Sequence, residues 1–97
     1  MAVIETLTFR LTAGTDDAAF LAADRRLQTE FVYHQPGLVR RTTARNDDGE
    51  WFVVTLWRAG SDFDEAAATA RSSPVVSEFA ALLDESSVRT SRYTTLD

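Results

Sequence analysis

The chemistry open to this chain begins with a single histidine. His34 is the only imidazole in 97 residues, so any acid–base or ligand-binding role for histidine must use it. It stands at the end of a predicted helix, where an imidazolium interacts well with the carbonyl end. Two interpretations stay open, a capping or surface role and a place in a pocket between that helix and the sheet. Neither a second histidine nor a carboxylate accompanies it at metal-ligand spacing, so we expect no protein-bound metal.

Three aromatic residues are candidates for contact with a flat ligand. Trp51 and Trp57 face the same side of a predicted strand, where they form core, a subunit interface or an aromatic wall for a planar molecule. Tyr93 needs a partner for its hydroxyl if it is buried, and it could bind a substrate oxygen. The candidate ligand-binding residues are therefore His34, Trp57 and Tyr93, and no catalytic residue is assigned.

Charged side chains supply weaker candidates. Asp24 borders the apolar stripe of the first predicted helix, where it is either a buried base or the partner of an arginine. Arginines on the predicted edge strands either bind an anionic ligand or form cross-strand and intersubunit ion pairs. These arginines are Arg40, Arg41, Arg45, Arg89 and Arg92.

The composition excludes several classes of function. The net charge is −5 and every basic residue is arginine, so we expect neither nucleic acid nor an anionic membrane surface as a partner. The absence of cysteine excludes disulfides, thiolate metal sites and a cysteine nucleophile. The chain shows no signal peptide, no apolar run of about 20 residues and no glycine-rich phosphate loop. We therefore expect a cytoplasmic protein without a cofactor.

Hydrophobic periodicity predicts the elements that position these residues. Alternating patterns predict strands at residues 3–12, 38–46, 51–57 and 88–96. A helix is expected to begin with the Thr15 hydroxyl as its cap, followed by the carboxylates of Asp16 and Asp17, and to run to about residue 34, where Pro36 and Gly37 end it. Ser61 is the expected cap of a second helix, which restarts at Ser73 and Pro74. The turn before residue 51 is expected to place Gly49 at positive φ.

The strand at residues 51–57 has no polar face and constrains the architecture most. Trp51, Val53 and Trp57 point to one side, while Phe52, Val54 and Leu56 point to the other. The two helices can cover one face, and a second copy of the chain is the simplest cover for the other. The element order predicts one domain, residues 1–97, with a ferredoxin-like βαββαβ fold (class α+β). In this plan a four-stranded antiparallel sheet carries both helices on one face, and its first and third strands are central.

The chain resembles the dimeric α/β-barrel superfamily, and within it the antibiotic-biosynthesis-monooxygenase-like proteins. The resemblance covers nearly the whole chain and depends on its length, its element order and three local features. These features are the turn Gln35-Pro36-Gly37, Trp57 at the end of the third strand, and Ser73-Pro74 within the second helix. It implies a homodimer in which two sheets pack face to face and form a barrel.

Two departures from the family pattern affect the expected function. Leu56 stands where family members commonly have a glutamate, and Ala70 stands where they commonly have a histidine. The second change disfavours heme degradation, because that histidine position would ligate the iron. The resemblance implies a cofactor-free monooxygenase-like enzyme acting on a small aromatic or polyketide-like molecule. The alternative is a non-catalytic dimeric module that binds a small ligand or serves in stress responses.

Overall fold

Strands and helices follow one another as the sequence predicts. The computed structural model describes all residues, 1–97. Its elements are β1 (Val3–Phe9), α1 (Asp17–Glu30), η1 (Val32–His34), β2 (Leu38–Arg45), β3 (Trp51–Trp57), α2 (Gly60–Ala70), α3 (Pro74–Ala80), η2 (Glu85–Ser87) and β4 (Arg89–Thr94), where η denotes a short 3-10 helix. The strands form one antiparallel sheet in the order β2-β3-β1-β4. The predicted ferredoxin-like fold and the central position of the first and third strands are confirmed.

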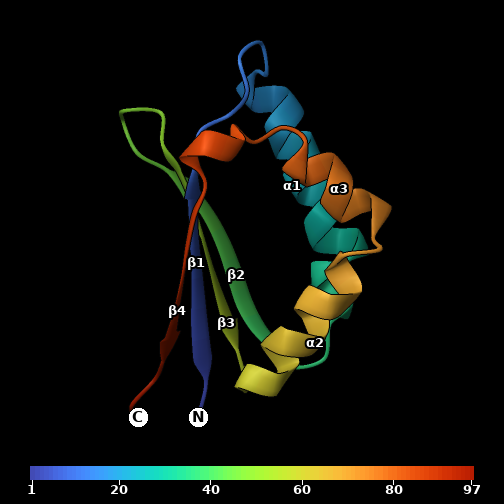
Figure 1. The fold of residues 1–97 in the computed structure, drawn as a ribbon, viewed down its shortest axis with the longest axis vertical. Coiled ribbons are helices and arrows are strands. Elements are labelled where there is room, and N and C mark those ends of the chain that lie inside the picture. Colours follow the sequence, from blue (N-terminus) through green and yellow to red (C-terminus); the bar gives the residue numbers. More distant parts are fainter.

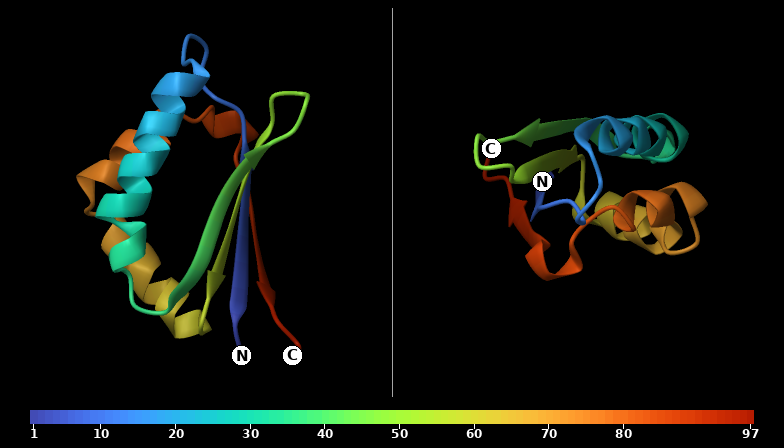
Figure 2. Two further views of the ribbon diagram at one scale, coloured as in Figure 1. Left: turned by 180° about the vertical axis from the view of Figure 1, so that it is seen from behind. Right: turned by 90° about the horizontal axis from the view of Figure 1, so that it is seen from above.

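The molecule has two layers, with all helices on one face of the sheet. Figure 1 shows α1, α2 and α3 on one side of the strands, and the view from behind in Figure 2 shows the other side of the sheet bare. The two chain ends lie together at one end of the sheet, where the Thr95 N–H donates to the Ala2 carbonyl at 2.9 Å (Figure 1). None of the helices combines the length and the apolar character that crossing a membrane requires.

The side chains of β3 show which sheet face meets the helices. Trp51, Val53, Thr55 and Trp57 are all buried on the helix side. Phe52, between them in sequence, is 37% exposed on the other side. The sequence pattern does not predict which face of the sheet meets the helices, because the strand is apolar on both sides.

Aromatic rings form the main core at one end of the two central strands. Phe9 and Phe20 are fully buried, and their ring centroids lie 5.5 Å apart. The Phe20 ring also lies 4.5 Å from Trp51 and 5.4 Å from Phe79. A smaller apolar cluster packs at the opposite end of these strands: Val3, Trp57 and Ala66. The core is therefore divided along the sheet, and helix α2 packs only on its smaller part.

The helix boundaries differ from the sequence prediction in their capping. The Asp16 carboxylate caps α1 by accepting from the Ala19 N–H at 2.7 Å, while the Thr15 hydroxyl pairs with Thr12 instead. The helix ends at Glu30, before the predicted residue 34, and the last turn continues as η1. Helix α2 begins without a side-chain cap, so the prediction that Ser61 caps it is wrong. The predicted restart is confirmed, since Ser73 caps α3 and Pro74 is its first residue.

The first and last strands of the chain are shorter than predicted, because the backbone groups next to their ends bond to other partners. Strand β1 ends at Phe9, and the next N–H, that of Arg10, donates to the Ser87 hydroxyl at 2.8 Å. Strand β4 spans Arg89–Thr94. The predicted turn before β3 is confirmed, with Gly49 at a φ of 82°.

Candidate functional site

A cavity of about 180 Å³ separates the sheet from the helices near the middle of the molecule. It lies between the two parts of the core and takes lining residues from both. Twelve of its fifteen lining residues are hydrophobic, which makes it an apolar site with few polar groups. The three polar members are Glu5, Arg41 and Thr55.

These polar residues belong to one row that crosses the sheet. Arg41 on β2 pairs with Thr55 on β3, Thr55 pairs with Glu5 on β1, and Glu5 pairs with Arg92 on β4. Register partners in an antiparallel sheet project from the same face, so all four side chains point toward the helices. The fold thus places one carboxylate between two guanidinium-bearing strands.

Glu5 is the most perturbed ionisable group of the chain. Burial in the apolar cavity raises the pKa of the Glu5 carboxyl above its ordinary value of 4.5. The Trp57 N–H and the positive charges of Arg41 and Arg92 act in the opposite direction but do not cancel the effect of burial. A carboxyl with a raised pKa in a cavity is a candidate for proton transfer.

The indole N–H of Trp57 is a second polar group in the cavity, beside Glu5. Its indole nitrogen is buried, and it makes no hydrogen bond of normal geometry within the chain. The Glu5 carboxyl lies close enough for the indole N–H to lower its pKa, which places the two groups together. A buried donor without a partner is costly, so this N–H is available to a ligand oxygen.

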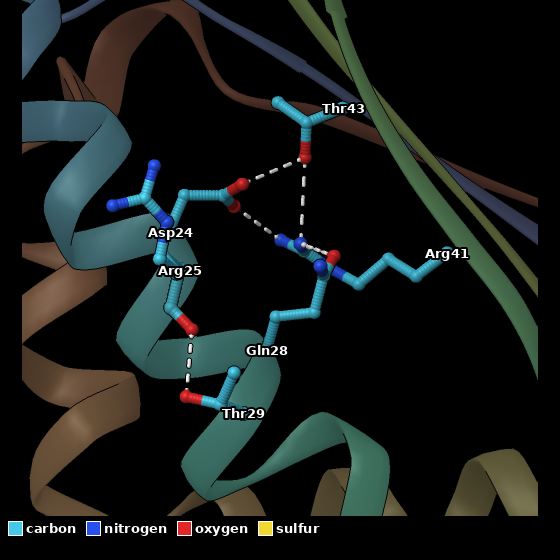
Figure 3. A network of polar contacts seen from close by, with 6 residues as sticks. All are labelled: Asp24, Arg25, Gln28, Thr29, Arg41 and Thr43. Atoms are coloured by element: carbon cyan, nitrogen blue, oxygen red, sulfur yellow. Dashed lines mark hydrogen bonds and ion pairs between the residues drawn. The ribbon is translucent and has the colours of Figure 1, made fainter.

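A network from helix α1 holds the Arg41 guanidinium in place (Figure 3). Arg41 donates to the Asp24 carboxylate at 2.8 Å and to the Gln28 side-chain oxygen at 3.0 Å. Thr43 donates to the second Asp24 oxygen at 3.0 Å. Asp24 is 7% exposed, so this ion pair is buried. Of the two interpretations of Asp24, the structure supports the partner of an arginine.

Arg92 is engaged in a similar way on the other side of Glu5. Its guanidinium donates to Asp64 at 2.9 Å and stacks over the Phe63 ring at 4.8 Å, both on helix α2. A third arginine, Arg45, pairs with Asp17 of α1. These arginines therefore bind helices of their own chain. Arg41 and Arg92 are each paired with an acid of their own, so each stabilises the Glu5 carboxylate less than an unpaired arginine would.

Small side chains on helix α2 leave the space that forms the cavity. Ala66, Ala67 and Ala70 line it, where larger residues would fill it. Phe63 of the same helix adds an aromatic ring, with its centroid 6.2 Å from that of Trp57. The cavity therefore depends on the residue sizes of α2 and on the divided core.

Solved structures share this architecture. SnoaB, a cofactor-independent oxygenase from Streptomyces nogalater, is 22% identical, with a TM-score of 0.81 over 99% of this chain and 94% of that chain. Rv0793 from Mycobacterium tuberculosis is 20% identical, with a TM-score of 0.72 over 100% of this chain and 97% of that chain. A proposed antibiotic biosynthesis monooxygenase from Chloroflexus aurantiacus is 12% identical, with a TM-score of 0.73 over 100% and 95%. This chain has the fold of the antibiotic-biosynthesis-monooxygenase-like proteins. No protein-family model and no curated protein sequence matches it.

Only one of the three ligand-binding candidates predicted from the sequence reaches the cavity. Trp57 lines the cavity, because its side chain projects from the sheet face that meets the helices. His34 is exposed in η1 and is not among the lining residues. Tyr93 is 57% exposed and pairs with Ile4, which places it on the uncovered face of the sheet. Trp51 belongs to the main core beside Phe20. No group of three or more potential metal ligands comes together.

Glu5 was not among the residues predicted from the sequence, although a signal for it exists. Val3, Leu7 and Phe9 are the apolar residues of one face of β1, and Glu5 is the fourth member of that series. A carboxylate within the apolar face of a central strand is uncommon unless it is paired or functional. Thr55 carries the same signal in β3, since it alternates with Val53 and Trp57.

Removal of the buried carboxylate of Asp24 should destabilise the fold strongly. Asp24→Ala leaves the Arg41 guanidinium buried without its partner, and we expect the free energy of unfolding to fall by about 3 kcal/mol. Urea denaturation measures this change. The matched control is Glu78→Ala, which breaks the half-exposed pair with Arg26 and should cost about 1 kcal/mol or less. Equal losses in the two variants would contradict the assignment of a buried pair.

Replacement of Glu5 by glutamine should change how stability depends on pH. The folded protein holds the Glu5 proton more tightly than the unfolded chain, so the wild type loses stability as the pH rises from 4.5 through the raised pKa. We expect Glu5→Gln to melt a few degrees above the wild type at pH 7, with the difference vanishing below pH 4.5. Melting curves between these pH values provide the measurement.

The control for this pH series is Glu50→Gln, which alters an exposed carboxylate in the turn before β3. It should melt with the wild type throughout the series. A Glu5→Gln difference that did not vary with pH would show that the charge of Glu5 is not its cause.

Proposed function

We propose that this chain is a cofactor-independent monooxygenase-like enzyme that oxidises a small aromatic or polyketide-like molecule in the cavity. The observation that carries the proposal is the Glu5 carboxyl, whose pKa is raised by burial in an apolar cavity beside the unpaired Trp57 N–H. Of the ligand-binding candidates predicted from the sequence, we retain Trp57.

Glu5 is the proposed general base. A carboxylate with a raised pKa is a stronger base than an exposed one, and the apolar lining offers few other groups to compete for the proton. The substrate class that suits it has a CH₂ group activated by a neighbouring carbonyl and aromatic ring. Removal of one proton from that carbon yields an enolate.

The reaction balances with molecular oxygen as the oxidant. The enolate passes one electron to O₂, and the carbon radical and superoxide combine to form a C–O bond. The peroxide takes up a proton to become a hydroperoxide. Loss of water then breaks the O–O bond and removes the second hydrogen of that carbon, which becomes a carbonyl. One oxygen atom enters the product and the other leaves as water, while the substrate supplies the electrons.

Trp57 is the proposed oxyanion donor. Negative charge moves to the substrate carbonyl oxygen as the proton leaves, and a preorganised N–H stabilises that charge in a site with little water. The Thr55 hydroxyl lines the same part of the cavity and supplies a second polar contact. The Arg41 charge, held by Asp24, lies in the same row and favours the anion.

The fold comparison supports this choice of reaction over other reactions of an apolar site. SnoaB shares the fold over nearly the whole chain and is a cofactor-independent oxygenase. The identity of 22% limits that support to the architecture, so the chemistry proposed here depends on Glu5 and Trp57.

Oxygen consumption with quinone-forming substrates tests the enzyme. We expect the purified protein to consume O₂ above the buffer rate with 1-naphthol or anthrone, with one quinone formed per O₂. Glu5→Gln should lower the rate by about a hundredfold, because general base catalysis contributes at least that much. An oxygen electrode and quinone absorbance provide the two readouts.

The control is again Glu50→Gln, which should retain the wild-type rate. No uptake above buffer with either substrate would contradict the proposed enzyme. A ligand-induced rise in melting temperature without oxygen uptake would instead favour the non-catalytic small-ligand-binding module.

We also propose that a second copy of the chain covers the open face of the sheet. Ile4, Val54 and Leu56 project from this face, and Phe52 and Tyr93 on the same face are 37% and 57% exposed. An apolar sheet face without cover is unusual for a monomer and typical of an interface. A symmetric partner is the simplest cover, because it offers the same apolar surface.

Sedimentation velocity tests the dimer. We expect a dimer at micromolar concentration, and we expect Leu56→Asp to shift it to monomer because a carboxylate would be buried without a partner. Ala18→Asp, on the exposed outer side of α1, adds the same charge and should leave the dimer intact. A wild-type monomer at that concentration would contradict the proposal.

A further inference from the structure

The volume of the cavity restricts the size of its ligand. Cavities that hold drug-sized molecules measure about 300–1,000 Å³, whereas an apolar cavity of about 150 Å³ holds a single benzene ring. The cavity here measures about 180 Å³. The cavity is open on one side, so it covers one ring or two fused rings of a ligand, and a third fused ring would extend beyond it.

The charges around the cavity restrict the polarity of the ligand. Glu5 faces Arg41 and Arg92, but Asp24 binds the first guanidinium and Asp64 binds the second. Three carboxylates thus surround two guanidiniums, which leaves no free positive charge for an acidic ligand. A ring carboxylate would bring a further negative charge beside Glu5 in an apolar surrounding, where repulsion is strong.

Two neighbouring polar groups of the cavity, the Trp57 N–H and the Glu5 carboxylate, favour one functional group on the ligand. The Trp57 N–H needs an acceptor, and the Glu5 carboxylate accepts a hydrogen bond. A hydroxyl on an aromatic ring does both at one oxygen, since it accepts from the indole and donates to the carboxylate. The Phe63 ring, on the α2 side of the same cavity, offers an aromatic contact for the ligand ring.

We infer that the cavity binds a neutral one- or two-ring phenol, and that Glu5 rejects aromatic carboxylates of the same size. The inference deepens the proposed function by naming its substrate class, and it depends on the same site. Loss of the hydroxyl proton to Glu5 gives the phenolate, which is the same delocalised anion as the enolate of the CH₂ tautomer, so the proposed oxidation starts from the bound phenol.

Ligand binding under nitrogen tests the inference without turnover. The probes are 1-naphthol, 1-naphthoate and anthrone, titrated at pH 7 by calorimetry. We expect 1-naphthol to bind at least about tenfold more tightly than 1-naphthoate and than anthrone. Glu5→Gln should bring 1-naphthol and 1-naphthoate within about threefold of each other, while Glu50→Gln should retain the wild-type ratio.

A second variant tests the size limit separately. Ala70→Leu places a larger side chain into the cavity. It should weaken the binding of 1-naphthol at least about tenfold more than it weakens the binding of phenol. Equal binding of 1-naphthoate and 1-naphthol by the wild type, or tighter binding of anthrone, would overturn the inference even if the enzyme oxidises anthrone. Absence of oxygen uptake with the expected binding order would contradict the proposed reaction and leave the ligand class standing.

Discussion

The buried ion pair between Asp24 and Arg41 is the interaction on which the rest of the site depends. The pair joins helix α1 to the edge strand β2. The side chain of Asp24 is 10% exposed and that of Arg41 is 4% exposed. Because Asp24 and Gln28 bind the guanidinium, Arg41 stays at the end of the polar row without neutralising Glu5. The pKa of Glu5 can therefore rise in response to burial, although two arginines flank it. The same helix contact thus serves both the stability of the sheet and the chemistry of the cavity.

The cavity follows from the division of the core. Large aromatic residues fill one end of the central strands, and α1 and α3 pack there. Helix α2 covers the other end mainly through alanines, so it approaches the sheet without filling the space above Glu5 and Thr55. A well-packed interior leaves few such spaces, and each one costs stability. A cavity of this kind is consequently a feature that a binding site would require.

Sequence patterns predicted the architecture well because two periodicities dominate it. Apolar residues on both sides of the strand at 51–57 identified β3 and its central position, and Ser73-Pro74 identified the start of α3. The choice of sheet face could not be predicted, because Trp57 and Leu56 are equally apolar on opposite sides. The caps of α1 and α2 were misassigned because adjacent Thr15 and Asp16 are both good caps, and because Ser61 lies within the first turn of α2.

The candidate site was less accessible to sequence reasoning because it depends on contacts between distant residues. Glu5 stands out only when β1 is known to be central and to face the helices. The pairing of Asp24 with an arginine was one of two alternatives, and only the packing of α1 on the sheet shows that the partner is Arg41. His34 and Tyr93 attracted attention as isolated functional groups, but η1 and the uncovered sheet face place them away from the cavity.

The turn between η1 and β2 adds a mechanical property to this arrangement. Gly37 has a φ of 82°, and the Asp62 side chain of α2 occupies the position that a β-carbon at residue 37 would take. A larger residue there would collide with the Asp62 side chain, so we expect it to push the first turn of α2 outward together with Phe63. The gap over the polar row would widen without alteration of any residue that borders it. The size of residue 37 therefore controls how closely α2 approaches the sheet, although this residue lies in a loop outside the cavity.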